Sequence, residues 1–408
     1  MTGDPIVGHR LGLVGERDPA AADLVRRLIE LACRTLPLAY RAGQFAHTMV
    51  AVTGPDGRRA ITPRGESVRY ALIALLGLRR LPPDRCAAVL GGGDPADLLD
   101  LIMKRIDELT SPGDVALACW VAAEADHGDL PRALRRLREL DLAAAAGWPD
   151  SGDDQIDVVA AAWVITALVA ARGMADVEQH LAAARRRLLT ARQVCFGHLI
   201  GGRQAAYRRH VGSFADQVYP IQALARLHAS SDDPAALAAA QETAAVICRA
   251  QGADGQWWWH YDARSGTVIE GYPVYSVHQH AMAPMALLDL AEAGGQAHTG
   301  PICRGLSWLA APPETAWPLV TDDPPVIWRK VARDDRRKLV RGVRAAVSGF
   351  APRLRLKGLD RLFPPGVIDY ECRPYELGWL LFTWLPDLVD LPDSPEPGAP
   401  PVAAPEPA

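Results

Sequence analysis

The sequence predicts an all-α fold, a toroid of six helical hairpins that is written (α/α)6. Strongly apolar helical segments alternate along the chain with amphipathic ones, and no region alternates polar and apolar residues for long enough to build a sheet. Hydrophobic residues make up 49% of the 408 positions and charged residues 23%, with Ala and Leu dominating the long segments. Hairpins repeated at intervals of roughly 40 to 95 residues indicate an array, and six of them can close into a ring.

The inner ring of the toroid is predicted from six segments that are apolar on nearly every helix face. These segments begin near residues 66, 114, 154, 214, 276 and 370. The outer ring is predicted from amphipathic segments, at 21–36, 130–144, 176–192, 234–250 and 300–310. A further apolar helix is predicted at 94–109. In this arrangement the starts of the inner helices, and the loops before them, converge on one funnel.

Three of the inner segments carry polar residues, then a proline, then an apolar run. Proline is tolerated in the first helical turn, but deeper inside it costs ~3 kcal/mol or marks a kink. We expect Pro220 and Pro374 near first turns, and Pro284 about two turns into its helix, which it would kink.

One domain is predicted over residues 21–390, between an N-terminal extension, 1–20, and a Pro-rich tail, 391–408, that is expected to be disordered. The formal net charge of −4 gives no reason to expect nucleic acid as a partner. Seven scattered cysteines with no CxxC pair indicate neither a disulfide framework nor a zinc–thiolate site. The sequence has no signal-peptide core and no apolar run of ~18 residues, so it predicts a cytoplasmic protein without an integral membrane segment.

The stretch 251–293 gathers aromatic and titratable residues as no other part of the chain does. A structural loop would not require so many, and we therefore expect this stretch to form one wall of a substrate pocket. Its candidate binding residues are Trp257, Trp258, Tyr261, Tyr272, Tyr275 and Gln279. One or two of the three consecutive tryptophans, 257–259, can instead bridge two hairpins.

Within this stretch, Gln251, Gly255 and Trp257 form a QxxxGxW arrangement. Together with the hairpin spacing it resembles the α/α toroids, which include terpenoid cyclases with Gln-Trp repeats and six-hairpin carbohydrate enzymes such as glycosidases and sugar epimerases. The resemblance covers residues 20–385 in architecture but only this one repeat in motif. The DDQID run around Asp154 and Asp157 departs from the DxDD motif of the cyclases, and no Asp, Cys and His zinc set of the prenyltransferase kind is evident.

Four residues are the candidate catalytic groups: Asp157, Asp216, Glu371 and His278. Glycosidic chemistry needs two carboxylates, one kept protonated by an apolar setting and one ionised. Glu371 or Glu376, opposite Asp157 or Asp216, would supply such a pair. An N-cap role for Asp154 and a salt-bridge cluster around Arg373 are the structural alternatives.

His278 would supply acid–base chemistry near neutral pH, as epimerisation requires, unless it is a hydrogen-bonded core residue. Its spacing of two from His280 puts the rings on different helix faces, so we expect no metal, and no cofactor is predicted. Gln222, Gln279 and Arg373 would position hydroxyls or a carboxylate, with Tyr375 and Asp154 as further binding residues. Trp163 and Trp379 are assigned to the core.

The stretch 328–344 carries eight basic residues. It could bind a diphosphate, an acidic sugar or another protein, whereas a solvated helix with Asp334 and Asp335 as internal partners is the commoner explanation.

A pocket of carboxylates, Gln, His, Arg and Tyr beside stacking aromatics suits a hydroxyl-rich ligand better than a hydrocarbon. The sequence therefore favours a carbohydrate-active enzyme, a glycoside hydrolase or a sugar epimerase, acting on a sugar or oligosaccharide. The alternatives are a terpenoid-cyclase-like enzyme with an unusual aspartate acid, acting on an isoprenoid, and a non-catalytic toroid that binds glycan or protein.

Overall fold

The computed structural model describes residues 9–53, 59–146, 156–200, 208–335, 339–351, 354, 356 and 358–386. The predictions for Asp154 and for the Pro-rich tail lie outside these residues.

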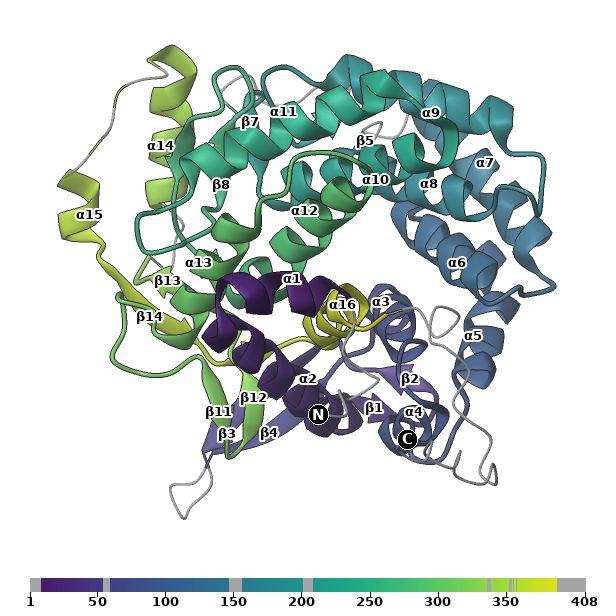
Figure 1. Cartoon of the computed structure of the whole chain (residues 1–408), viewed down its shortest axis with the longest axis horizontal. Helices are drawn as coiled ribbons and strands as arrows, with labels where there is room; N and C mark the ends of the chain where they lie inside the picture. Colours follow the sequence, from purple (N-terminus) through teal and green to yellow (C-terminus); the bar gives the residue numbers. More distant parts are fainter. Residues whose placement is uncertain are drawn as a thin grey trace, which may run out of the picture.

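Six helices form a closed inner ring (Figure 1). Each packs against the next along the chain, and the last packs against the first. They are α3 (Val68–Leu78), α6 (Pro112–Glu124), α8 (Val158–Ala170), α10 (Ala215–Ser231), α12 (Ala283–Glu292) and α16 (Pro374–Trp384). The predicted (α/α)6 toroid is thus confirmed, with each inner helix close to its predicted start.

Six further helices form the outer ring, and each packs on an inner helix or on its first turn. They are α2 (Pro19–Ala39), α5 (Pro95–Lys104), α7 (Leu130–Ala146), α9 (Glu178–Ala191), α11 (Pro234–Ala250) and α13 (Thr299–Ala310). Shorter or peripheral helices complete the described chain: α1 (His9–Arg17), α4 (Pro83–Val89), a 3-10 turn (Ile106–Glu108), α14 (Leu339–Phe350) and α15 (Gly358–Leu362). None of the described helices is long and apolar enough to span a bilayer.

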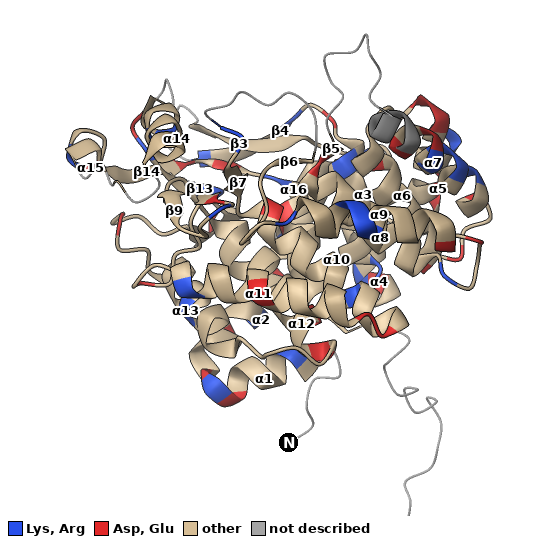
Figure 2. Ribbon diagram, turned by 90° about the horizontal axis from the view of Figure 1, so that it is seen from above, with Lys and Arg blue, Asp and Glu red and all other residues tan. Residues whose placement is uncertain are grey.

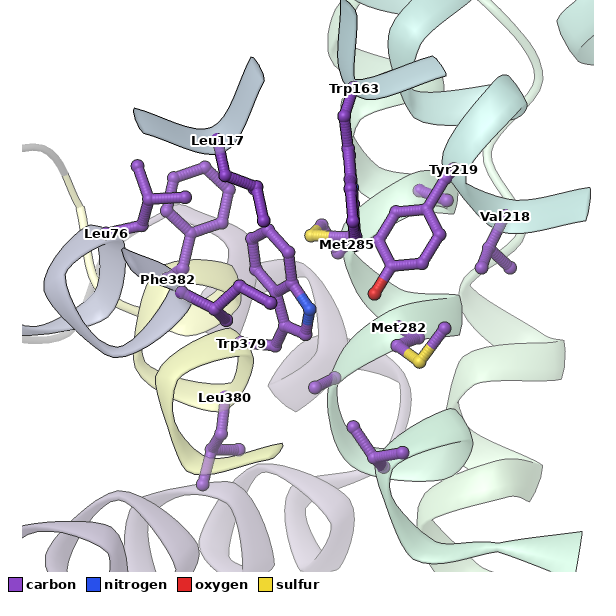
Figure 3. Close-up of a cluster of buried hydrophobic side chains, with 14 of the residues drawn as sticks. Leu76, Leu117, Trp163, Val218, Tyr219, Met282, Met285, Trp379, Leu380 and Phe382 are labelled. Carbon is purple, nitrogen blue, oxygen red and sulfur yellow. The ribbon is translucent and has the colours of Figure 1, made fainter. Parts of the chain in front are cut away.

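The axis of the ring is filled by side chains from every inner helix (Figure 3). Leu76, Leu117 and Trp163 come from α3, α6 and α8, while Tyr219 and Trp379 come from α10 and α16. Trp163 and Trp379 are buried, as predicted. Burying an apolar side chain contributes roughly 1.5–3 kcal/mol, so this shared cluster is a main source of cohesion between hairpins.

Local signals set where the inner helices begin. Ser67, Ser111 and Asp157 accept hydrogen bonds from the backbone N–H groups of Tyr70, Asp114 and Ala160, at 3.3, 3.4 and 2.7 Å. Such caps stabilise a helix start by about 1 kcal/mol each.

The prolines fall partly where the sequence places them. Pro374 is the first residue of α16. Pro220 lies in the second turn of α10, deeper than predicted. Before Pro284 the backbone forms a π-turn (His278–Met282), so the predicted irregularity in this helix takes the form of a widened turn.

The prediction that the chain builds no sheet is wrong, because short strands pair across the starts of the inner helices. Three three-stranded sheets join β3 (Thr48–Thr53), β4 (Arg59–Arg64) and β15 (Glu371–Cys372); β7 (Val211–Ser213), β8 (His260–Asp262) and β9 (Val268–Glu270); and β10 (Val274–Tyr275), β13 (Lys330–Arg333) and β14 (Pro365–Asp369). Two-stranded pairs are β1 (Tyr40–Arg41) with β2 (Gln44–Phe45), β5 (Ile156–Asp157) with β6 (Leu199–Ile200), and β11 (Val320–Asp322) with β12 (Pro325–Ile327).

Most of these strands are too short for an alternating pattern to be read from sequence. They gather on one face of the molecule, because several lead directly into an inner helix (Figure 2). β5, β7 and β15 precede α8, α10 and α16 in this way. Strand pairing therefore holds together the connections that enter the inner ring.

Candidate active site

Two polar clusters lie where the inner helices begin. The glutamate cluster comprises Glu376, Glu371, Arg329 and Arg373, around the start of α16. The aspartate cluster comprises Asp157, Asp216 and His198, around the starts of α8 and α10. Backbone N–H groups at helix starts carry partial positive charge, so this face of the ring favours anionic ligands.

Glu376 is the fully buried member of the glutamate cluster. It stands in the first turn of α16, and neither of its carboxylate oxygens has a hydrogen-bond partner among the described residues. Burial raises the pKa of Glu376 to about 7, against the opposing charges of Arg329 and Arg373. A carboxyl group with such a pKa can both hold and release a proton near neutrality.

Arg329 is the cation nearest to this acid, with its Nε 3.6 Å from Glu376 Oε1. The same guanidinium lies 3.3 Å from Glu371 Oε2 and stands 5.2 Å from the centre of the Tyr275 ring. Its backbone N–H donates to the carbonyl of Glu371 at 2.9 Å, beside strand β13. The strand thus fixes the position of this buried charge.

Glu371 and Arg373 form the outer part of the cluster. Arg373 donates to the hydroxyl of Tyr70 at 2.8 Å, and its Nη2 lies 3.4 Å from Glu371 Oε2. Glu371 therefore sits between two arginines and is partly exposed. Glu371 thus has the contacts of a salt-bridge residue. Glu376 has the surroundings expected of a proton donor.

In the aspartate cluster, the pairing of β5 with β6 brings Asp157 beside His198. Asp216 is fully buried and accepts hydrogen bonds from the backbone N–H and the hydroxyl of Ser213, at 2.6 and 2.7 Å. His198 Nδ1 lies 3.1 Å from Asp216 Oδ1. This hydrogen bond, aided by the charges of Asp216 and Asp157, raises the pKa of His198.

Aromatic rings occupy the space between the two clusters. Tyr70 and Tyr375 lie 4.6 Å apart, Tyr219 and Trp163 5.1 Å, and Tyr219 and Trp379 5.9 Å, all between ring centroids. The Arg69 guanidinium stands 5.5 Å from the centre of the Trp163 ring. Against the effect of burial, the charge and hydrogen bond of Asp114 raise the pKa of Arg69, with a smaller contribution from the charge of Asp157.

Several predicted binding residues are buried and make contacts within the fold. Trp257 and Tyr261 are fully buried and pack around Phe214, at centroid distances of 5.5 and 6.4 Å. Gln222 donates to Asp289 Oδ2 at 3.1 Å, and Gln279 to the carbonyl of Tyr275 at 3.1 Å. Their amide nitrogens are thereby engaged within the fold, whereas both amide oxygens are buried without a hydrogen-bond partner among the described residues.

The QxxxGxW residues connect α11 to α13. Gln251 donates to the carbonyls of Gly255 and Pro301 at 3.0 and 2.9 Å. Gly255 has φ +103°, and its Cα lies against the backbone of Arg304 so closely that a side chain would not fit. Trp257 lies beside Gly305 of α13. The motif thus joins two outer helices and leaves Trp257 no free face.

His278 lies in a stack of rings rather than at an open mouth. Its ring centroid is 4.5 Å from Phe214, 5.0 Å from Tyr275 and 6.0 Å from Trp259. Burial lowers the pKa of His278 to about 3, so the ring is neutral at pH 7 and a poor proton donor or acceptor. The core interpretation, which the sequence left open, fits this position.

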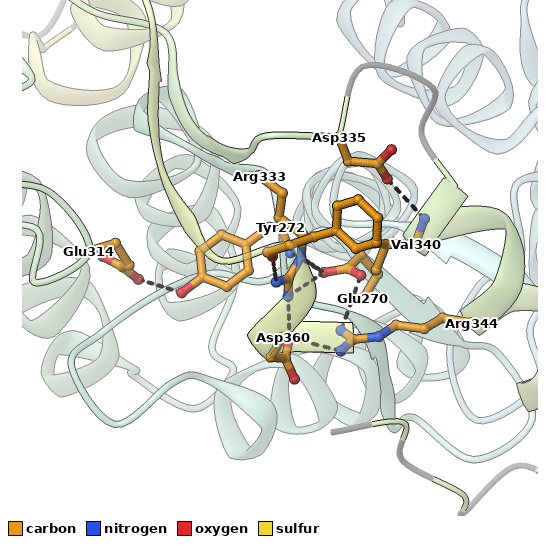
Figure 4. A network of polar contacts seen from close by, with 9 residues as sticks. Glu270, Tyr272, Glu314, Arg333, Asp335, Val340, Arg344 and Asp360 are labelled. Carbon is orange, nitrogen blue, oxygen red and sulfur yellow. Dashed lines mark hydrogen bonds and ion pairs between the residues drawn. The ribbon is translucent and has the colours of Figure 1, made fainter. Parts of the chain in front are cut away.

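Trp258 and Tyr272 lie apart from the two clusters. They line a cavity of about 530 Å³ between β9 and α14, together with Arg333, Arg344 and Asp360. The Tyr272 hydroxyl donates to Glu314 Oε1 at 2.8 Å (Figure 4). These two aromatics therefore cannot serve the same ligand contacts as Tyr275 and Tyr375.

The basic stretch 328–344 is not the solvated helix that its charge pattern favours. Arg333 and Arg344 turn inward and lie 3.2 and 3.1 Å from the buried Glu270, and both reach Asp360 of α15 (Figure 4). Asp335 caps α14 by accepting hydrogen bonds from the N–H groups of Leu339 and Val340. Four of the fourteen described residues of the stretch form strand β13 and six begin α14. Arg333 and Arg344 pair with a buried acid.

His198, Arg329 and Arg69 were not selected from the sequence. His198 follows no recognisable motif, because its partner Asp216 is 18 residues away and the β5–β6 pairing brings in Asp157. Arg329 belonged to a basic stretch in which no single position stood out. The usable signal was an indirect one, namely that buried acids at helix starts require cations from somewhere in the chain.

No family model and no curated protein matches the sequence. Several solved structures share its fold. An unsaturated glucuronyl hydrolase from Bacillus sp. GL1 is 12% identical, with a TM-score of 0.52 over 88% of this chain and 94% of that one. A possible member of the GH105 family from Klebsiella pneumoniae is 11% identical, with a TM-score of 0.52 over 88% and 91% of the two chains. An unsaturated glucuronyl hydrolase from Streptococcus agalactiae is 10% identical, again with a TM-score of 0.52, over 88% and 90%. At these identities the likeness shows a common α/α-toroid fold.

Proposed function

We propose that the protein is a glycoside hydrolase that acts on an acidic sugar at the starts of its inner helices. One observation carries this proposal: Glu376 is a buried carboxyl group with a pKa raised to about 7, and its oxygens have no hydrogen-bond partner among the described residues. Glycoside hydrolysis needs such an acid to protonate the leaving oxygen and a second, ionised carboxylate. The likeness of fold to glucuronyl hydrolases is consistent with this chemistry.

In the proposed reaction Glu376 donates a proton to the glycosidic oxygen, and Asp157 activates a water molecule. Asp216 is a less suitable base, because Ser213 and His198 already occupy its oxygens. It is a positioning residue that orients His198 and, through it, the surroundings of Asp157. Removing the carboxyl group of Glu376 or of Asp157 should therefore lower kcat by about 10²- to 10⁴-fold.

The surroundings of these carboxylates favour an acidic sugar over a neutral one. Arg329 and Arg373 flank Glu376, and the backbone dipoles of several helices point the same way. Tyr275 and Tyr375 offer ring faces for stacking against a pyranose, at the edge of the cluster. A hydrocarbon substrate would offer these charged groups no hydrogen bond in exchange for the water it displaces, which argues against an isoprenoid.

The test is an activity screen with three substrate classes: oligosaccharides ending in a saturated or unsaturated uronic acid, neutral oligosaccharides, and prenyl diphosphates. Mass spectrometry separates the reactions, because hydrolysis yields two shorter products whereas epimerisation leaves the mass unchanged. Cleavage of the uronic-acid substrates alone is expected.

Glu376→Gln and Asp157→Asn should each abolish this cleavage while leaving the fold intact. Glu242→Gln is the matched control, since Glu242 is an exposed residue of α11 that pairs with Arg192. Turnover of prenyl diphosphates alone, or cleavage that survives both site variants, would refute the proposal.

A further inference from the structure

Helix α14 lies on the body of the protein with a mixed face inward, in which Val340, Ala345 and Ser348 are buried. Arg344 pairs with the buried Glu270, and the hydroxyl of Ser348 is 2.7 Å from His210 Nε2. Ala345 of the same face packs with Val211 and Ile269. An amphipathic helix on a globular protein normally buries its apolar face, whereas α14 fully buries only Val340 among its larger apolar residues.

The apolar face of α14 is left on the outside. Leu339, Val343 and Phe350 are spaced four and seven residues apart, so they form one stripe along the helix. They are 52%, 43% and 92% exposed. We call these three residues the outward stripe. An exposed apolar face of this kind marks a contact with another body or with a membrane.

The sequence around the stripe is strongly basic. Residues 336–361 contain nine Lys and Arg and one acidic residue, Asp360, whereas the whole chain carries a net charge of −4. Among the described residues of this segment, Arg341 is partly exposed and Arg361 is exposed, whereas Arg344 pairs with Glu270 and Asp360. The charge complements an anionic surface, and apolar residues interleaved with basic ones are the composition of interfacial helices.

We propose that α14 docks on a membrane surface rich in anionic lipids, with Leu339, Val343 and Phe350 inserted at the headgroup boundary. A second copy of the chain is disfavoured, because a twofold contact through the stripe would bring two basic segments together. The helix stands with α15 at the outer edge of the body, where it can meet a flat surface (Figures 1 and 2). This docking does not depend on the proposed reaction.

The test is flotation of the full-length protein with two kinds of vesicle, phosphatidylcholine alone and phosphatidylcholine mixed with phosphatidylglycerol. We expect binding to the anionic vesicles only, and weaker binding as salt is raised, because salt screens the basic segment. The affinity of the triple variant Leu339→Ser, Val343→Ser, Phe350→Ser for these vesicles should be lower by about tenfold or more.

The control variant carries the same kind of change at Leu38, Leu101 and Met174, which are exposed apolar residues on other elements. It should bind the anionic vesicles as the unaltered protein does, and circular dichroism should show that both triple variants are folded. Absence of binding to the anionic vesicles, or binding that the stripe variant retains, would overturn the proposal. So would self-association that the stripe variant abolishes, since a second copy would then be the partner.

Discussion

Glu376 and Glu371 lie five positions apart, yet they differ in chemistry because of what surrounds them. Glu371 contacts two guanidinium groups and is partly exposed, whereas Glu376 is sealed in the first turn of α16. Burial in an apolar setting penalises the charged form of a carboxyl group, and Arg329 only partly offsets that penalty. Glutamate can therefore be a salt-bridge partner at position 371 and, as we propose, a proton donor at position 376.

The raised pKa of Glu376 predicts how stability changes with pH. A carboxyl group that binds its proton more tightly in the folded state stabilises the fold at low pH, and this contribution is lost as pH rises through the folded pKa. For Glu376 the loss falls between about 4.5 and about 7. The free energy of unfolding of the wild-type protein should therefore decrease across this window, relative to that of Glu376→Gln.

Urea unfolding at a series of pH values measures this difference. The variant keeps the shape of the side chain and removes the titration, so the wild-type curve should fall below the variant's by on the order of a few kcal/mol. A constant difference between the two proteins from pH 4 to pH 8 would contradict the raised pKa. Glu242→Gln, on the surface of α11, should show no such trend.

At the level of residues, the sequence indicated the helix starts but not which side chains face inward there. Asp157 and Asp216 could be selected because an acid ahead of an apolar run needs a partner or a function. Proposing Glu376 instead of Glu371 as the acid required the burial of each residue, which depends on strand β15 and on Arg329 from another part of the chain. The sequence could not show that the His278 ring packs against Phe214, Tyr275 and Trp259.

The ring closes where α3 meets α16, through two glycines. A Cβ added at Gly378 would lie 2.5 Å from the carbonyl oxygen of Ile73 and 2.7 Å from the Cα of Ala74. Gly77 of α3 faces Gly378 in the same way. These two helices therefore touch backbone to backbone, at a separation that no larger residue allows.

Gly378→Ala should lower the free energy of unfolding by about 1–3 kcal/mol, because backbone atoms cannot move aside as a flexible side chain can. Gly342→Ala is the matched control, since Gly342 lies inside α14 with nothing within 4 Å of an added Cβ. That control should unfold at the same or a higher urea concentration, as alanine favours helices. Equal stability of Gly378→Ala and the wild-type protein would mean that the contact is looser than described.

At the level of elements, hydrophobic periodicity was sufficient to place both rings. The six inner helices and the helices that pack outside them lie near predicted helical segments, because each spans at least ten residues. The strands could not be found in the same way, since most have two to four residues and pair with distant segments. For α14 the charge pattern favoured a solvated helix over 328–344, whereas the helix is Leu339–Phe350 and two of its polar side chains contact Glu270 and His210.

At the level of the whole molecule, the N-terminal helix α1 joins the ring through an ion pair and through helix packing. Arg10 of α1 lies 2.5 Å from Asp289 of α12, which also pairs with Arg226 of α10 at 2.8 Å. α1 packs on α2 and α13 as well. Although it falls within the predicted N-terminal extension, this helix contributes to the packing of the ring, and the proposed domain boundary at residue 21 remains a prediction.

Arg10→Gln should lower the free energy of unfolding at neutral pH by about 1–2 kcal/mol, since the buried Asp289 loses one of two charged partners. The two arginines hold the pKa of Asp289 well below its ordinary value. Their contribution is present above the ordinary pKa of an aspartate and is lost as pH falls through the lowered one. The deficit of the variant should accordingly shrink in strong acid.

Thermal or urea unfolding at neutral and acid pH measures the effect. Arg26→Gln is the control, because the Arg26–Asp23 pair lies on the exposed surface of α2 and should contribute almost nothing. If both variants lose the same amount of stability, α1 is a dispensable appendage and the interpretation fails.

Strand β13 stands between the two regions discussed above. It has four residues, Lys330–Arg333, with Arg329 immediately before it and Arg333 at its end. Arg329 holds the charge beside Glu376, and Arg333 is tied through Glu270 and Asp360 to α14 and α15. A displacement of α14 or α15 would thus be transmitted to Arg329, and so to Glu376, through a strand of only four residues.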